Sequence, residues 1–229
     1  MTAVFIISAP SGSGKSTLVN KVLSMVPNLD FSVSYTTRPP RGKEQNGREY
    51  YFVTRPVFEQ MVAKDEFLEH AEVFGNYYGT ARSFLRQAEQ NENDLLLDID
   101  VQGAEQIKRE LPDAVSIFIL PPNRTTLEKR LRERSQDSEE VIRRRLATAA
   151  REIENYGKYD YILVNDRLDD SVAALQAILL AERIQRSRAG RSASDASTIK
   201  TAEQCRLRNV QERVRPILAS FELAAPGGR

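Results

Sequence analysis

The stretch VFIISAPSGSGKST, residues 4–17, decides the fold. Its first half is a continuous apolar run, which is typical of a parallel strand that is buried on both faces. Its second half, Ala9 to Thr17, follows the phosphate-loop pattern G-x-x-x-x-G-K-[ST], with Ala9 in place of the first glycine. A plain Gly/Ser turn is the structural alternative. The order of strand, loop, Lys-Ser pair and helix favours a nucleoside triphosphate site.

Each residue type in this loop has a physical role. Gly12 and Gly14 let the backbone curl so that successive N–H groups face a phosphate. The helix that begins near Lys15 directs the positive end of its dipole to the same place. Lys15 can reach the β- and γ-phosphates, and Ser16 can offer its hydroxyl to Mg²⁺. The motif alone does not separate a kinase from a GTPase or an ATPase.

Further apolar stretches alternate with helical ones along the 229 residues. This alternation predicts an α/β fold with right-handed crossovers. We expect strands at Ala3–Ser8, 94–100, 114–120 and 159–164. We expect helices at 15–25, 103–110, 127–155 (with a break near Ser135 to Ser138) and 171–188.

Residues 28–82 differ in character. The stretches 31–35, 50–54 and 69–78 are short, aromatic-rich and mixed in polarity, and a Pro- and Gly-containing loop, Arg38 to Gly47, separates the first two. They predict an inserted subdomain of antiparallel strands.

The composition excludes several classes of protein. Lys and Arg number 33 and Asp and Glu 32, so a nucleic-acid partner bound through a global basic field is not expected. The single cysteine, Cys205, and the single histidine, His70, exclude multi-Cys zinc and multi-His metal sites. We expect His70 to be a partly buried histidine that packs or forms hydrogen bonds and has no part in the chemistry. The apolar runs are too short for a membrane span and no secretory signal is evident, so we expect a cytoplasmic protein with no membrane partner.

A second motif, Asp98-Ile99-Asp100, ends the apolar stretch 94–100. Alternate strand residues point the same way, so both carboxylates face one side at the carboxyl end of a parallel strand, where ligands bind in α/β sheets. Asp98 is therefore a candidate to hold Mg²⁺, directly or through water.

With these motifs the chain resembles guanylate kinases of the bacterial type. The resemblance extends over residues 3–187 and is carried, in order, by 9–17, Ser34 to Arg41, Gly47 to Phe52, Phe67 to Thr80, Leu97 to Ala104, Ile117 to Pro122 and Val164 to Asp166. Several motifs at family spacing are far more specific than the phosphate loop alone.

The resemblance implies a P-loop core with a central parallel sheet flanked by helices, an inserted mixed α/β GMP-binding subdomain and a helical lid. It implies transfer of the γ-phosphoryl group of ATP to GMP, giving ADP and GDP, with Mg²⁺ as cofactor. The implied boundaries are 1–30, 83–124 and 156–187 for the core, 31–82 for the GMP subdomain, 125–155 for the lid, and 188–229 for a linker and C-terminal extension.

The resemblance also implies how GMP is held. Two guanidinium groups and two phenols suit a phosphate dianion, and an ionised carboxylate can accept from guanine N1–H and the exocyclic amine. Adenine would leave that carboxylate unpaired. The implied residues are Arg38, Arg41, Tyr50 and Tyr78 for the phosphate, Glu69 for the base edge, Ser34 and Thr80 near O6, and Asp100 for a further guanine contact.

On the ATP side, the resemblance matches Arg134 and Arg145 to the lid arginines that close over the phosphates, with Arg130 a weaker match, and places Asn165 near the adenine. Ser135 stands where the family usually has glycine. The implied ATP set is Ala9, Pro10, Ser11, Gly12, Ser13, Gly14, Lys15, Ser16, Thr17, Arg130 and Asn165. The implied catalytic residues are Lys15, Arg38, Arg134 and Arg145, and the implied metal ligands are Ser16 and Asp98.

Two other functions are alternatives to the kinase. Guanylate-kinase-like binding modules take phosphorylated protein segments without catalysis, but they typically lose the phosphate-loop lysine and the lid arginines, which are present here. A P-loop kinase for another phosphorylated ribose compound would have no base for Glu69, Ser34 and Thr80 to contact.

The tail beyond Arg188 does not match the family pattern. Residues 189–197 have the composition of a linker, 204–223 predict a helix that stops or kinks at Pro216, and Pro226 to Arg229 predict disorder. Three interpretations stay open: an oligomerisation helix, which would make a homo-oligomer, an unstructured extension, or a feature of this particular sequence. We expect the tail to be dispensable for catalysis, because every matched site residue precedes it.

Overall fold

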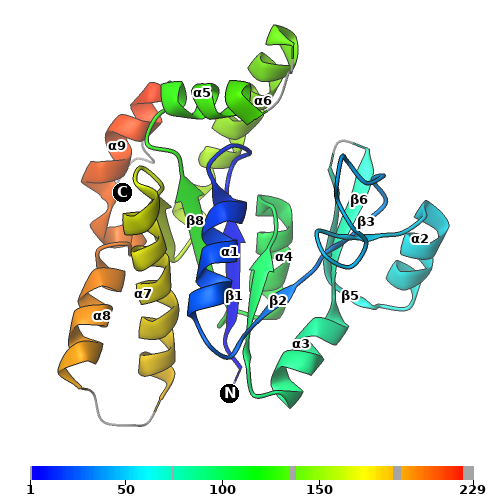
Figure 1. The fold of residues 1–229 in the computed structure, drawn as a ribbon, viewed down its shortest axis with the longest axis horizontal. Coiled ribbons are helices and arrows are strands. Elements are labelled where there is room, and N and C mark those ends of the chain that lie inside the picture. Colours follow the sequence, from blue (N-terminus) through cyan, green and yellow to red (C-terminus); the bar gives the residue numbers. More distant parts are fainter. Residues whose placement is uncertain (1, 74, 135–137, 188–191, 224–229) are drawn as a thin grey trace. The chain divides into compact units, whose positions relative to one another are not determined.

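The computed structural model describes residues 2–73, 75–134, 138–187 and 192–223. It is an α/β fold with a central parallel sheet flanked by helices, as predicted (Figure 1). The strand order is β2-β7-β1-β8-β9 in this five-stranded sheet and β4-β3-β6-β5 in a second, four-stranded sheet. β1 (Val4–Ser8) is buried along its whole length. The chain forms two compact units, Met1–Ile6 with Asn28–Val115 and Ile7–Pro27 with Ser116–Arg229.

The first unit contains one edge of the parallel sheet. β2 (Leu29–Ser32) pairs in parallel with β7 (Asp94–Asp98), with Leu29 opposite Asp94. The Asp94 carboxylate accepts a hydrogen bond of 2.8 Å from the backbone N–H of Ala3, which ties the start of the chain to β7. The helices α3 (Arg82–Gln90) and α4 (Val101–Glu110) precede and follow β7.

The four-stranded sheet also belongs to the first unit. Its strands are β3 (Tyr35–Thr36), β4 (Tyr51–Phe52), β5 (Phe67–Val73) and β6 (Asn76–Ala81). β6 pairs antiparallel with both β3 and β5. The helix α2 (Arg55–Ala63) packs on the sheet through Phe58, whose ring stacks on Phe67 at 4.5 Å and on Tyr77 at 5.3 Å. These rings form the core of a small sheet that presents the β5–β6 hairpin.

The second unit is built around β8 (Val115–Leu120) and β9 (Tyr161–Val164), which pair in parallel. α1 (Lys15–Met25) packs against α7 (Leu168–Arg186). Leu18, Val22, Leu175, Ile178 and Leu179 in these helices are fully buried, which explains why the apolar periodicity predicted both helices. The helices α5 (Arg124–Arg134) and α6 (Glu139–Ile153) follow β8.

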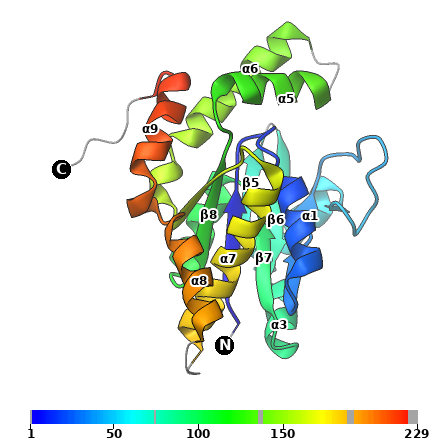
Figure 2. The same cartoon turned by 60° about the vertical axis from the view of Figure 1, so that its left-hand side comes forward.

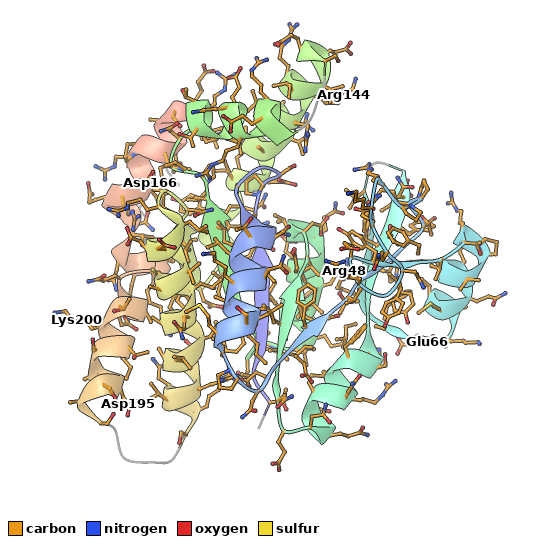
Figure 3. All side chains as sticks on the ribbon, viewed as in Figure 1. Arg48, Glu66, Arg144, Asp166, Asp195 and Lys200 are labelled. Atoms are coloured by element: carbon orange, nitrogen blue, oxygen red, sulfur yellow. The ribbon has the colours of Figure 1, made fainter. Side chains whose placement is uncertain are left out.

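The tail forms helices in the same unit. α8 (Ala193–Glu203) lies along α7, and α9 (Gln211–Ser220) contacts α5 (Figures 1 and 2). A capping box between Ser192 and Asp195 starts α8. In Figure 3, Lys200 of α8 points away from α7. None of the described helices is long and apolar enough to cross a bilayer.

The strand predictions for residues 31–35, 50–54 and 69–78 need correction. β2 joins the parallel sheet and not the small one, and its half-exposed residues reflect its edge position. β3 and β4 pair in parallel, although the β3–β6 and β5–β6 pairs are antiparallel as predicted. The stretch 69–78 is a hairpin that turns at Gly75, where φ is +77°. α2 and α3 were not predicted from their weakly apolar sequences.

Other boundaries also moved. α4, α5 and α7 begin two or three residues before the predicted starts. Their largely polar first turns carry no apolar periodicity that would mark these starts in the sequence. The linker prediction is wrong from Ala193 onward, where α8 begins, and α9 continues through the exposed Pro216 to Ser220. α5 ends at Arg134 and Ser138 caps α6, as the predicted break requires. Residues 135–137, 188–191 and 226–229 lie outside the described part of the chain.

Candidate active site

The phosphate loop lies between β1 and α1 in the second unit, and we call residues 9–17 with Arg130, Arg145 and Asn165 the P-loop site. Gly12 and Gly14 have φ values of +90° and +88°, in the left-handed region that favours glycine. Gly14 caps α1, and Ser13 N–H donates to the Pro10 carbonyl at 3.1 Å. The two glycines therefore supply the backbone curl that the motif predicted, and Ala9 does not prevent it.

Side chains from distant parts of the sequence surround this loop. The Asn165 amide donates to the Ser13 carbonyl at 2.7 Å, and a Cβ atom on Gly14 would lie only 2.3 Å from the same amide nitrogen. A Cβ atom on Gly12 would lie 2.9 Å from Leu131 and 3.0 Å from Leu127. A Cβ atom at either position would therefore displace a neighbouring side chain in addition to straining the backbone.

Two of the predicted arginines reach the P-loop site. Arg145 of α6 donates to the Ser11 hydroxyl at 2.8 Å. Arg130 of α5 donates through Nη2 to the Asn165 carbonyl at 3.1 Å, and its buried Nη1 has no hydrogen-bond partner among the residues that the structure describes. Buried donors are normally satisfied, so an unpaired guanidinium nitrogen here suits an anionic ligand. Arg134 ends α5, and its side chain lies outside the described part.

α5 and α6 are tied to each other by ion pairs. Arg132 of α5 pairs with Glu128 on its own helix at 2.8 Å and with Glu139 at the start of α6. The hydrogen bond to Arg132 lowers the pKa of Glu139 from its ordinary value. These contacts are exposed and contribute modestly to stability, but they link the helices that carry Arg130 and Arg145.

A second cluster lies on the hairpin of the first unit. We call Glu69, Thr80, Asp100 and Gly103, with the loop 34–50, the hairpin site. Glu69 on β5 lies opposite Thr80 on β6, and both are buried. The Thr80 hydroxyl donates to Glu69 Oε1 at 2.7 Å. Three of the predicted base-contacting residues, Glu69, Thr80 and Asp100, are therefore brought together.

The environment of Glu69 disfavours its charge. Burial raises the pKa of this carboxyl, the hydrogen bonds with Thr80 lower it, and the nearby Asp100 carboxylate raises it, so that the pKa is about 7. Asp100 caps α4 by accepting from Gly103 N–H at 2.8 Å. A ligand that donates hydrogen bonds to Glu69 would stabilise the ionised form.

The loop between β3 and β4 holds the arginine that was predicted to contact a phosphate. Arg38 is only 6% exposed and donates to Glu44 Oε1 at 3.0 Å and to the Pro39 carbonyl at 2.8 Å. Burial lowers the pKa of Arg38, but hydrogen bonds to Glu44 and Tyr78 outweigh it and the pKa is raised overall. Glu44 Oε2 also accepts from Arg41 N–H at 2.7 Å.

The remaining predicted residues lie near these groups or on exposed positions. The Tyr50 and Tyr78 rings meet edge to face at 5.8 Å, and the Arg38 guanidinium lies 5.3 Å from the Tyr50 ring centre. Arg41 is exposed, and the Ser34 carbonyl accepts from Tyr51 N–H at 2.9 Å. In the second unit, Ser16 and Thr17 are exposed on the first turn of α1 and Lys15 is half-buried. Asp98 is the half-buried last residue of β7, so the predicted strand 94–100 ends two residues early, and Asp100 is the N-cap of α4 and not a strand residue.

A family model described as guanylate kinase matches residues 1–182. This is well over half of the chain and includes both sites. The chain belongs to the guanylate kinase family.

Individual relatives agree with the family model. A guanylate kinase from Koribacter versatilis (strain Ellin345) is 59% identical over 222 residues, covering 96% of this chain and 95% of the relative. A guanylate kinase from Escherichia coli (strain K12) is 51% identical over 187 residues, covering 81% of this chain and 90% of that protein. The crystal structure of a guanylate kinase from Anaplasma phagocytophilum superposes with a TM-score of 0.66 at 33% identity, covering 88% of this chain and 95% of that one.

The structure adds residues to the hairpin site and the P-loop site that the sequence did not single out. A Cβ atom on Gly103 would lie 2.6 Å from Glu69 Oε2, so this glycine makes room for the carboxylate. The Glu44 carboxylate accepts a hydrogen bond from the Arg38 guanidinium, and Leu127 and Leu131 pack close to Gly12. The signal in the sequence that could have marked Gly103 is its place as the third residue of a helix, where a residue without a side chain indicates close packing. No local pattern marked the other contacts.

Proposed function

We propose that this chain transfers the γ-phosphoryl group of ATP to GMP, giving ADP and GDP. The observation that carries the proposal is the buried Glu69 carboxylate, bonded to Thr80 and facing the helix cap of Asp100 and Gly103. A buried carboxylate beside hydroxyl groups matches the donor edge of guanine and not the edge of adenine.

In the hairpin site, Glu69 accepts from guanine N1–H and from the exocyclic amine. Ser34 and Thr80 lie near O6, and Asp100 provides a further contact to the base. Glu69 Oε1 already accepts from the Thr80 hydroxyl, and Glu69 Oε2 lies on the side of Gly103. A base that presented an acceptor there would leave a desolvated carboxylate unpaired, which is costly.

The phosphate of GMP is held by the loop of the same site. Arg38 and Arg41 supply guanidinium groups, and Tyr50 and Tyr78 supply phenol donors. When GMP binds, its phosphate replaces the Glu44 carboxylate as the partner of Arg38. The buried position of Arg38 then makes the new ion pair stronger than a surface pair would be.

ATP occupies the P-loop site. The curled backbone of residues 9–17 and the start of α1 hold its phosphates, and Lys15 contacts the β- and γ-phosphates. Arg145, which reaches Ser11, and Arg134 stabilise the charge that spreads over the transferring group. The unpaired Nη1 of Arg130 supports a contact with ATP, and Asn165 holds the loop while lying near the adenine.

Mg²⁺ is the implied cofactor, and the available donors fit it. A hydroxyl at Ser16 and a carboxylate at Asp98 are hard oxygen ligands, and Mg²⁺ usually takes only one or two protein ligands beside phosphates and water. When bound, the ion would neutralise phosphate charge. Ser16 would hold it directly and Asp98 directly or through water.

The chemical step needs no general base. An oxygen of the GMP phosphate is already ionised and attacks the γ-phosphorus, while the bond from that phosphorus to the β–γ bridging oxygen breaks and ADP leaves. Catalysis then consists of alignment and charge neutralisation by Lys15, Arg38, Arg134 and Arg145. We assign residues 31–82 to GMP binding, residues 125–155 to a lid that excludes water, and residues 1–30, 83–124 and 156–187 to the core.

The test is an assay of ADP production from Mg-ATP with GMP, AMP, CMP or UMP supplied separately. We expect turnover with GMP alone, and a Glu69→Gln variant should lose most of that preference. A folded protein that binds ATP but turns over none of the four would contradict the proposal. It would favour a non-catalytic module for phosphorylated protein segments.

A further inference from the structure

The C-terminal segment 192–223 lies beyond the family model, which ends at residue 182. It makes contacts at two places in the second unit. One is the strand β9, and the other is the beginning of α5. Because the Koribacter versatilis relative covers 96% of the chain, its match includes most of this segment.

The first contact anchors the segment. Ile162 N–H donates to the Cys205 carbonyl at 2.8 Å, and Leu207 N–H donates to the Asp160 carbonyl at 3.1 Å. Tyr161 and Arg206 form an antiparallel bridge beside the edge strand β9. A short extended piece of the tail therefore pairs with the strand edge, which reduces the number of exposed backbone groups there.

A buried polar network strengthens this anchor. Glu182 of α7, which is 7% exposed, accepts from the Tyr161 hydroxyl at 2.6 Å and from Arg206 at 2.7 Å. The Arg206 guanidinium also lies 4.0 Å from the Tyr161 ring centre. Removing one partner would leave a buried charge uncompensated, so the tail is held firmly at this point.

The second contact lies at the first turn of α5. The first N–H groups of a helix have no partner within the helix. In α5, Thr126 N–H donates to Asn123 Oδ1 at 2.7 Å, and Arg124 N–H donates to the Ser220 hydroxyl of α9 at 3.0 Å. Ser220 in turn donates to the Ile217 carbonyl at 2.6 Å. A side chain from the tail thus caps the helix that carries Arg130.

Apolar packing holds α9 in place for this cap. Val214, Ile217 and Leu218 of α9 are buried, and Phe221 directly after it is 6% exposed. The contacts between α9 and α5 are seen in Figures 1 and 2. The position of the Ser220 hydroxyl is therefore determined by a packed helix and not by a free chain end.

From its capped start, α5 runs to the phosphate loop. Leu127 and Leu131 are fully buried and pack where a Cβ atom on Gly12 would be. Arg130 on the same helix donates to the Asn165 carbonyl, and the Asn165 side chain donates to the Ser13 carbonyl. If the first turn of α5 shifted, Leu127, Leu131 and Arg130 would move with it and change their contacts with the phosphate loop and Asn165.

We propose that α9 is a positioning element for the P-loop site, acting through the hydrogen bond from Arg124 N–H to Ser220, in place of the expectation that the tail is dispensable. This inference rests on the proposed function for its kinetic readout, but ATP binding tests it independently. Ser220 does not touch substrate and is a positioning residue.

The variant that tests the inference is Ser220→Ala. Loss of a helix cap should shift α5 and raise both the dissociation constant for Mg-ATP and the KM for ATP, by roughly three- to tenfold. The KM for GMP should stay within about twofold, since the hairpin site lies in the other unit. Ser220→Thr keeps a hydroxyl and should restore most of the affinity. Ser197→Ala on the exposed face of α8 is the matched control.

Each outcome is decisive. An unchanged ATP dissociation constant in folded Ser220→Ala would overturn the proposal, and so would an equal rise in the KM values for ATP and GMP. If the wild-type chain turned over no monophosphate but Ser220→Ala still weakened ATP binding, the proposed reaction would fail while this inference stood.

Discussion

The hairpin site and the P-loop site achieve specificity in different ways. In the hairpin site, Glu69 and Thr80 lie on neighbouring strands, are buried, and bond to each other before any ligand arrives. In the P-loop site the side chains come from distant parts of the sequence: Arg145 bonds to Ser11, 134 residues away, and Asn165 bonds to Ser13, 152 residues away. In our proposal, the first site discriminates between bases through a buried carboxyl, and the second presents cations to a phosphate chain that is common to many nucleotides.

This contrast implies that substitutions in each site should act on different kinetic constants. Changes at the hairpin site should alter recognition of GMP, since an unpaired buried group penalises the wrong base. Changes at the P-loop site should alter the rate, because charge stabilisation there acts on the transition state.

The largest effect is expected for Lys15→Ala. Removing the cation that we propose to contact the β- and γ-phosphates should lower kcat by roughly 10³-fold, similar to the loss of a strong transition-state donor. The dissociation constant for GMP, measured by calorimetry, should stay within about twofold. A Lys15→Ala enzyme with nearly normal kcat would show that the loop backbone alone stabilises the transferring phosphoryl group.

The next effect concerns the hairpin site and a residue that the sequence did not select. In Gly103→Ala the new Cβ would lie 2.6 Å from Glu69 Oε2, so the carboxylate has to move. We expect kcat/KM for GMP to fall roughly 10- to 100-fold with little change in the KM for ATP. Gly157→Ala, where nothing lies within 4 Å of the added atom, is the matched control. If both variants behaved alike, Gly103 would have no role in placing Glu69.

Gly103 also illustrates what the sequence could and could not predict. The phosphate loop, the buried strands and the long amphipathic helices were predicted well, because each depends on a local pattern of glycine or apolar residues. Glu69, Thr80 and Asp100 were matched through family motifs, and the structure brings them together. The roles of Gly103 and Glu44 depend on contacts between segments that no local pattern encodes.

Edge elements were predicted less well for a related reason. β2 has the mixed polarity of a strand exposed on one side, so it was assigned to the wrong sheet. α8 has little amphipathic signal, with Ala202 as its only buried residue, and it is held by packing along α7. Tertiary contacts, not helix propensity, stabilise such segments.

A pH dependence should separate the two sites without any mutation. Burial raises the pKa of Glu69 to about 7, so the ligand-free carboxyl is mostly protonated at pH 6 and mostly ionised at pH 8. Since guanine needs the ionised acceptor, the KM for GMP should rise about tenfold from pH 8 to pH 6, whereas the KM for ATP should change much less. Glu69→Gln should remove this dependence. A flat KM profile for GMP in the unsubstituted enzyme would mean that Glu69 stays ionised.

The titration of Glu69 should also be visible in the thermal stability of the ligand-free protein. A pKa raised above the ordinary value of 4.5 means that the folded, ligand-free protein binds this proton more tightly than the unfolded chain does. The contribution of Glu69 to stability is therefore fully present below pH 4.5 and is lost as the pH rises through about 7. The difference in Tm between the unsubstituted protein and Glu69→Gln should change in that window.

The smallest effect is expected for Glu44→Gln. This variant tests whether the phosphate-binding part of the hairpin site is preformed for GMP, as the Glu69–Thr80 pair is for the base. The Glu44 carboxylate pairs with Arg38 at 3.0 Å and must give way to the GMP phosphate. Glutamine keeps an acceptor for Arg41 N–H but removes the competing charge. We expect the KM for GMP to fall about two- to fivefold with kcat unchanged, because Arg38 is then less neutralised in the free enzyme.

The exposed Glu59→Gln on α2, where Glu59 pairs with Arg55, controls for the loss of one charge. A rise in KM for Glu44→Gln alone would mean instead that Glu44 orders the loop for GMP, and that this site too depends on a group that does not contact the base.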